Sequence, residues 1–184
     1  MRNRIYTSSA TIDVRSIQYK QRNIGIIYSS CIERNWAFID MQNLYKGIQE
    51  RGWKINWFYF RQYLQREYHV FKAVVFMGYI KENIRLYDCL RNAGFEIEFR
   101  QVKRLSNGVI DGGNVDADLA SYAMDYKSNY EKAIIVADDG DYFRTIKSLY
   151  RQGKLKLIIS AHTIKNTSGF IKNEIERDLI LSIH

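Results

Sequence analysis

Residues 132–151 read KAIIVADDGDYFRTIKSLYR, and this stretch decides the class of fold. Its first six residues form the most strand-like run of the chain, and the run is short enough to be one buried strand. It stops at Asp138 and Asp139, and a helix is expected over residues 141–151, with Gly153 at its end. The stretch therefore predicts a buried strand and a following helix, with two aspartates at the junction.

The same alternation of strand and helix lies on both sides of this stretch. Further strands are expected over residues 36–39, 70–79, 95–102 and 155–160, and a short apolar segment lies at 179–183. Further helices are expected over residues 43–50, 56–67, 82–92, 115–127 and 169–177. Such alternation predicts parallel strands joined by crossovers, with helices on both faces of the sheet. We therefore expect an α/β fold, a three-layer α/β/α sandwich around a central, mainly parallel sheet.

Length and charge suit one globular domain with a polyanionic partner. The chain has 184 residues, and we expect a basic, partly flexible N-terminal extension over residues 1–34 and one α/β domain over residues 35–184. The formal net charge is +8, and the six basic and two acidic residues of the extension supply half of it. A basic balance suits nucleic acid, but it also occurs on solvated surfaces that bind none. No apolar run approaches the roughly 18–20 residues that span a bilayer, so a cytoplasmic location is expected.

Aspartates follow the predicted strands at the places where a parallel sheet binds ligands. Asp40 ends the first strand, and Asp138, Asp139 and Asp141 follow the central one; between them, Asp116 and Asp118 open a helix after a glycine-bearing loop. Ligands of such sheets bind at the carboxyl ends of the strands. If the first and central strands are neighbours, Asp40 and Asp139 lie side by side, and Asp116 can reach the same point.

Crowded carboxylates repel one another, and a hard divalent cation relieves that repulsion. Ligands that are all oxygen favour Mg²⁺ or Mn²⁺ over zinc. Each segment alone also has a structural interpretation, as a helix cap, a helix start or an acidic turn. Their conjunction at one edge favours the metal site. The histidines, His69, His162 and His184, form no ligand spacing and are interpreted as structural.

Three motifs of the chain resemble those of NYN (LabA-like) domains, within the PIN-like nuclease superfamily. Residues 38–45 resemble the opening motif and residues 113–119 the middle one. Residues 135–142 resemble the third motif, where the family usually reads Ser-Gly-Asp-Gly-Asp-Phe. The resemblance extends over about residues 36–183 and identifies residues 35–184 as an NYN/PIN-like nuclease domain.

The resemblance implies a sheet of strand order 3-2-1-4-5, a bound divalent metal and endoribonuclease activity. By position, the implied catalytic and metal-binding residues are Asp40, Asp116, Asp139 and Asp141. Asp118 and Asp138 are adjacent to matched positions and rank second as metal ligands. Asn43, in the opening motif, is expected to orient Asp40 or to bind the substrate.

The chain departs from the family pattern at several positions but keeps every matched aspartate. Ala137 replaces a small hydroxyl residue and Asp138 replaces a glycine, which adds a carboxylate that could bind the metal or repel phosphate. Gly112 stands where many members have a lysine. These departures leave the activity favoured and its rate open.

RNA is the expected substrate, and basic residues near the predicted strand ends are its candidate contacts. Phosphate contacts are expected from Lys81, Lys103, Arg104 and Arg144. Tyr79 and Tyr142 are candidates for stacking on bases, although most tyrosines of the chain are expected in the core.

Other functions fit the same pattern less well. A catalytically silent RNA-binding or scaffold module of the same fold is the nearest alternative. A Toprim-like enzyme should carry glutamate at Asp40, and a haloacid-dehalogenase-like phosphatase should carry aspartate at Gln42. The aspartates do not suit a receiver domain, and no GK[ST] loop indicates an NTPase. The RNA target stays open, as does whether the chain forms a homo-oligomer.

Overall fold

The computed structural model describes residues 33–104, 110–111, 114–162 and 168–182. Residues 1–32, most of the predicted extension, lie outside the described residues, as do Gly112 and His184. No helix within the described ranges is long and apolar enough to cross a membrane.

Six parallel strands form the central sheet. They are β1 (Asn35–Asp40), β2 (Val70–Gly78), β3 (Glu96–Arg100), β6 (Ala133–Val136), β7 (Leu155–Ser160) and β8 (Ile180–Ser182). Their order is β3-β2-β1-β6-β7-β8, and every pairing is parallel. The first five strands in this order confirm the expected 3-2-1-4-5 arrangement. The sequence indicated β8 only as a short apolar segment.

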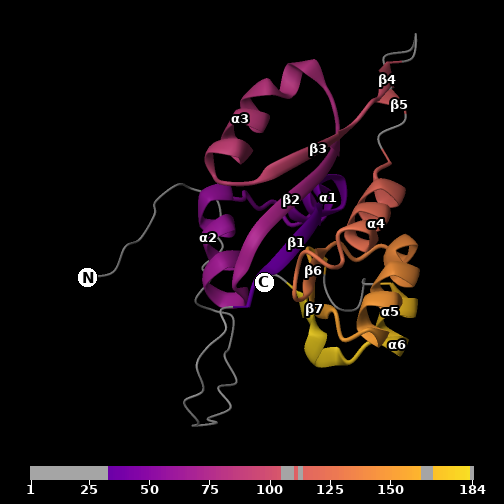
Figure 1. Cartoon of the computed structure of the whole chain (residues 1–184). Coiled ribbons are helices and arrows are strands. Elements are labelled where there is room, and N and C mark those ends of the chain that lie inside the picture. Colours follow the sequence, from indigo (N-terminus) through magenta and orange to yellow (C-terminus); the bar gives the residue numbers. More distant parts are fainter. Residues whose placement is uncertain (1–32, 105–109, 112–113, 163–167, 183–184) are drawn as a thin grey trace.

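Helices cover both faces of this sheet (Figure 1). One face carries α1 (Met41–Glu50), α2 (Trp57–Tyr68) and α3 (Ile84–Asn92), and the other carries α4 (Asp116–Asp125), α5 (Phe143–Arg151) and α6 (Gly169–Glu174). Short 3₁₀ turns lie at η2 (Lys81–Asn83), η3 (Gly140–Tyr142) and η4 (Arg177–Leu179), and β4 (Lys103–Arg104) pairs with β5 (Ile110–Asp111). The predicted three-layer sandwich is thus confirmed.

The central strand β1 shows why the sheet needs helices on both sides. Successive side chains of a strand point to opposite faces. Ile39 packs in the apolar cluster under α1–α3, whereas Phe38 packs in the cluster under α4–α6. Since all six residues of β1 are buried, the strand is the continuously covered centre of the fold.

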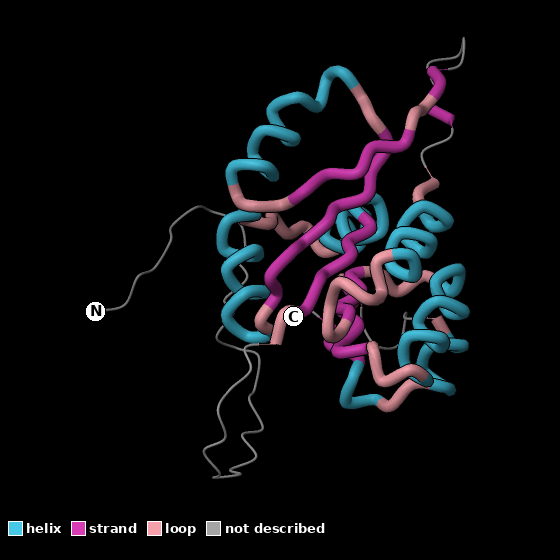
Figure 2. The backbone as a smooth tube through the Cα atoms, viewed as in Figure 1, coloured by secondary structure: helices cyan, strands magenta, loops and turns pink. Residues whose placement is uncertain are grey.

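The register of the strands places the aspartate segments at one edge of the sheet. Ile39 pairs with Val136, so β1 and β6 are neighbours and both end there. The tube of the backbone shows α4 beside these strands (Figure 2). Several predicted boundaries shift by a few residues; nearest the aspartates, residues 140–142 form η3 and the α-helix begins only at Phe143.

Candidate active site

Asp40, the last residue of β1, is a carboxylate held in place from two sides. Its side chain is only 5% exposed. Oδ1 accepts a hydrogen bond of 3.0 Å from the backbone amide of Asn43, which makes Asp40 the N-cap of α1. Oδ2 accepts one of 2.8 Å from the hydroxyl of Tyr142, in η3. Each oxygen therefore has a fixed donor, and an ionised carboxylate has lone pairs left for a further partner.

Asp116 supplies a second carboxylate at the same place. It is half-buried in the first turn of α4, and its backbone amide donates to Asn114 Oδ1 at 2.8 Å. Its negative charge raises the pKa of Asp40, and its carboxylate also raises the pKa of the Tyr142 hydroxyl. The structure therefore brings Asp40 and Asp116 together around Tyr142, as the sequence predicted for the two acids.

Burial and like charge both oppose ionisation of Asp40. Burial is the largest cause that raises its pKa, and the Asp116 charge adds to it, while the bonds from Asn43 and Tyr142 act in the opposite direction. Burial and the two carboxylates raise the pKa of Tyr142 far above its ordinary value, so this phenol stays neutral. Within the described part of the chain, neither acid forms an ion pair with a lysine or arginine. This donor set of oxygens without a compensating charge fits a hard divalent cation.

Asp139 and Asp141 lie at the same edge of the sheet, but their side chains do not join Asp40 and Asp116. Both side chains are exposed, and Asp139 Oδ1 accepts from the backbone amide of Asp141 at 3.4 Å, capping η3. Among the described residues, no three or more His, Cys, Asp or Glu side chains form a group that could hold a metal ion. Of the four predicted residues, Asp40 and Asp116 therefore converge, whereas Asp139 and Asp141 follow β6 as exposed side chains.

Asp138 has different partners, which form a group that we call the Asp138 network: Asp138, Ser160, His162 and Glu50. The Asp138 side chain is 5% exposed, and its Oδ2 accepts from Ser160 Oγ. His162 Nδ1 lies 2.9 Å from the same oxygen, and its Nε2 lies 3.4 Å from Glu50. The carboxylate of Asp138 is thus bonded to Ser160 of β7 and to His162 after it, and these contacts do not support the interpretation of Asp138 as an added metal ligand.

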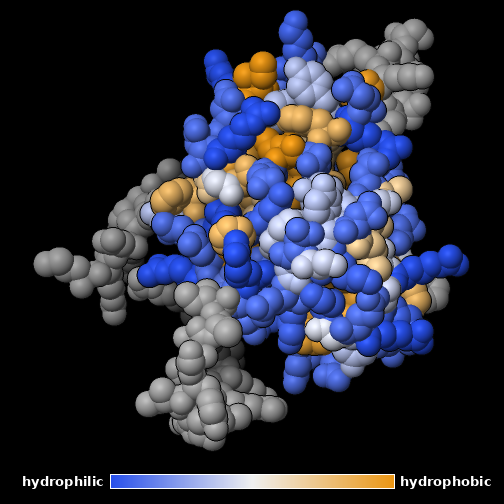
Figure 3. Space-filling view, in the orientation of Figure 1, coloured by the Kyte–Doolittle hydropathy of each residue, from blue (hydrophilic) through white to orange (hydrophobic). Residues whose placement is uncertain are grey.

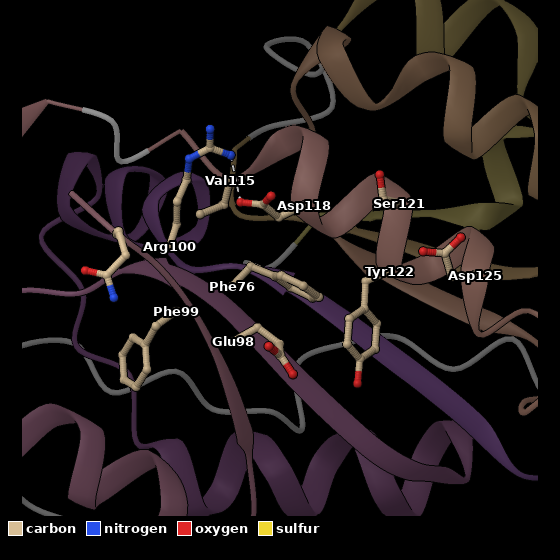
Figure 4. Close-up of a pocket in the computed structure, with 10 residues that line it drawn as sticks. Phe76, Glu98, Phe99, Arg100, Val115, Asp118, Ser121, Tyr122 and Asp125 are labelled. Carbon is tan, nitrogen blue, oxygen red and sulfur yellow. Dashed lines mark hydrogen bonds and ion pairs between the residues drawn. The ribbon is translucent and has the colours of Figure 1, made fainter.

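Asp118 is likewise engaged elsewhere. It forms an ion pair of 2.8 Å with Arg100 of β3. The pair spans a cleft of about 440 Å³ between α4 and the face of β2 and β3 (Figure 4), whose lining includes Phe76, Glu98 and Tyr122. Asp118 is therefore part of the cleft wall, and its contacts do not support the secondary metal role.

The candidate RNA contacts have mixed positions. Lys81 is exposed in η2 and Arg144 is exposed in the first turn of α5, on a molecule whose viewed face is largely hydrophilic (Figure 3). Lys103 and Arg104 form β4, which pairs with β5. Asn43 orients Asp40 through its backbone, while its side-chain oxygen accepts from the Asp138 amide at 3.4 Å.

The two tyrosines proposed to stack on bases differ in outcome. Tyr142 is completely buried, so the stacking prediction is wrong for this residue. Tyr79 is exposed, but its ring also packs against Tyr87 and Phe99. Sequence reasoning missed Tyr142 as the partner of Asp40, and the tyrosine in place of the usual phenylalanine of the third motif was the available signal.

The Asp138 network was also missed. Ser160 ends β7 and His162 follows it, so both lie at the carboxyl end of a parallel strand, where such sheets bind ligands. This position was the available signal. The histidines have no metal-ligand spacing, so His162 is interpreted as structural. Its contacts with Asp138 and Glu50 agree with that interpretation.

Comparisons with known proteins agree on the fold. The family model described as NYN domain matches residues 34–177. The chain is similar to a protein of unknown function from Vibrio parahaemolyticus, with a TM-score of 0.68 and 17% identity over 85% of this chain and 97% of that one. It also aligns with the T5 D15 protein co-crystallized with metal ions, at a TM-score of 0.38 and 14% identity over 61% of this chain and 51% of that one. The first likeness shows the fold alone, and the second is too weak to support an argument. No curated protein matches the chain.

Proposed function

Since this chain belongs to the NYN domain family, we propose that it is a metal-dependent endoribonuclease that hydrolyses RNA phosphodiester bonds. One observation carries the proposal. Asp40 and Asp116, which are distant in the sequence, meet at the carboxyl edge of the central strands around one buried hydroxyl. Two like charges held close together without a cation lower the stability of the fold. Such an arrangement suits a site that binds a cation.

Mg²⁺ or Mn²⁺ is the cofactor that this donor set would take. Mg²⁺ is usually held by one or two carboxylates and keeps several waters, so Asp40 and Asp116 suffice as direct ligands. Asp139 and Asp141, exposed after β6, would complete the site directly or through water. When bound, the ion would neutralise phosphate charge and supply an activated water.

The protein's own residues would bind and orient the RNA. Asp40 is fixed by its two hydrogen bonds, so it needs little rearrangement to receive a ligand. Lys81 and Arg144 are exposed and are proposed to contact phosphates, together with Lys103 and Arg104. Asn43 contributes by holding Asp40.

The competing function is a catalytically silent RNA-binding or scaffold module. The observation that favours it is the lack, among the described residues, of a group of three or more candidate metal ligands. Asp138 does not favour it, because its carboxylate is occupied by Ser160 and His162 rather than facing a phosphate.

The two functions separate in a cleavage assay with the purified chain. Single-stranded and structured RNA are incubated with Mg²⁺, with Mn²⁺ or with EDTA, beside Asp40→Asn and Asp139→Asn. We expect metal-dependent cleavage that falls by at least about 100-fold in Asp40→Asn, because a charge that acts at the reacting centre is lost. Asp88→Asn, an exposed aspartate on α3, is the matched control and should keep full activity. Cleavage that persists in EDTA or in Asp40→Asn contradicts the proposal, and RNA binding without cleavage supports the silent module.

A further inference from the structure

The Tyr142 hydroxyl is a polar group placed in the apolar core directly beneath the candidate site. Its residue is fully buried in the cluster under α4–α6, yet the hydroxyl reaches Asp40 Oδ2 at 2.8 Å. Buried hydroxyls need a hydrogen-bond partner, and this one has a carboxylate of the site. A phenylalanine ring, the usual residue at this position of the third motif, would fill the same space. The hydroxyl is therefore an addition that packing does not require.

The hydrogen bond fixes a rotation that would otherwise be free. The terminal torsion of an aspartate is broad, so a single donor leaves its carboxylate able to turn. Asn43 holds Oδ1 from the start of α1, and Tyr142 holds Oδ2 from η3. With donors from the start of α1 and from η3, the plane of the Asp40 carboxylate is set by two separate elements of the fold.

The same hydroxyl also connects Asp40 to Asp116. The Asp116 carboxylate interacts with Tyr142, and its charge acts on Asp40. The one hydroxyl proton is donated to Asp40, and this bond offsets part of the repulsion that the Asp116 charge exerts on Asp40 before any cation is present. This is the geometry that a two-carboxylate ion site needs in advance of binding.

We propose that Tyr142 is a positioning residue, whose hydroxyl holds Asp40 in the orientation in which Asp40 and Asp116 together bind a divalent cation. The inference rests on the proposed function and adds to it a residue that contacts neither the ion nor the RNA. Residues that orient metal ligands in this way typically contribute about 10- to 100-fold to metal affinity or activity.

The test compares two tyrosine-to-phenylalanine variants by calorimetric titration with Mn²⁺ in the absence of RNA. Tyr130→Phe is the control, because Tyr130 is buried in the same cluster and its hydroxyl donates to the backbone oxygen of Ala123 at 2.6 Å. We expect Tyr142→Phe to weaken Mn²⁺ binding about 10- to 100-fold and Tyr130→Phe to leave it unchanged. In the cleavage assay, Tyr142→Phe should lower kcat and leave KM for RNA unaltered, since Tyr142 is buried away from the substrate.

Several outcomes overturn the inference. Equal Mn²⁺ affinity and kcat in Tyr142→Phe and the wild type would do so, as would an equal loss in both variants, which would indicate general loosening of the core. A Tyr142→Phe protein that does not fold would show a structural role instead. A wild type that binds no Mn²⁺ removes both this inference and the metal-dependent function. A wild type that binds Mn²⁺ without cleaving RNA contradicts the proposed function alone, and the Mn²⁺ titration then still decides the role of Tyr142.

Discussion

Asp40 ends β1, Asp138 follows the neighbouring strand β6, and both residues are 5% exposed, yet their surroundings are opposite in kind. Asp40 shares its surroundings with a second acid, Asp116. Asp138 is instead bonded to Ser160 and to His162, and the His162 ring nitrogen lies 2.9 Å from its carboxylate. Burial alone therefore does not distinguish the two carboxylates, whereas their partners do: an acid with hydrogen-bond donors on its oxygens stabilises the fold, and an acid beside another acid is a candidate ligand for a cation.

The difference arises from which layers meet each side chain. Asp40 faces α4 and η3, whereas the Asp138 network links the end of β7 to the last turn of α1. Gly47 allows α1 to come this close, because a Cβ there would lie 2.6 Å from the Cβ of Ala161. The network thus joins α1 to the sheet.

The largest effect on stability is expected from Asp138→Asn. This change removes the charge that Ser160 and His162 are bonded to, and breaking such a buried arrangement costs about 3 kcal/mol of unfolding free energy. Urea denaturation in EDTA measures it, with Asp125→Asn on the exposed side of α4 as control, expected within about 0.5 kcal/mol of the wild type. If Asp138→Asn lowers the free energy of unfolding by less than about 1 kcal/mol, Asp138 does not have the structural role that distinguishes it here from Asp40.

The stabilisation of the fold by a divalent cation should depend on Asp40 and not on Asp138. Mn²⁺ at about 100 times its Kd should stabilise the wild type by about 2.7 kcal/mol. We expect Asp138→Asn to keep this increment and Asp40→Asn to lose it, as measured by denaturation with and without Mn²⁺. If Asp138→Asn loses the increment instead, the two acids have been assigned the wrong roles.

The smallest effect is a dependence of stability on pH. Burial raises the pKa of Asp40 in the folded protein above the ordinary value of 3.8. Protonated Asp40 therefore favours the folded state: its contribution is fully present below pH 3.8 and is lost as the pH rises through the folded pKa. In EDTA, the stability of the wild type relative to Asp40→Asn should fall as the pH rises from about 3.5 to 7. Denaturation curves across this range measure the difference, and a constant or growing advantage of the wild type would show that the carboxylate is not strained.

Much of the fold could be predicted because its signals are local. The run of residues 133–136 has no polar residue, and Asp40 and Asn56 cap helices through their own side chains. Neither the short strand β8 nor its pairing with β7 could be predicted in the same way. Three residues carry little pattern, and which strand they pair with is set by the whole chain.

The site was predictable only in part. Strand ends and motif spacing indicated Asp40 and Asp116, but the burial of Asp138 depends on Ser160 and His162, which are 22 and 24 residues away. Tyr142 was misjudged because residues 140–142 form a 3₁₀ turn. Such a turn has three residues per turn rather than 3.6, so it changes the direction in which a side chain points.

The edge strand β3 has a consequence for self-association. Among the described residues, β3 is the outer strand on its side of the sheet; it is five residues long and carries Glu96, Glu98 and Arg100. Charged side chains on a short outer strand discourage another chain from adding a strand there, because their water shells would have to be stripped on pairing. We therefore expect that copies of this chain do not join their sheets edge to edge through β3. The interface of any homo-oligomer is expected on another surface.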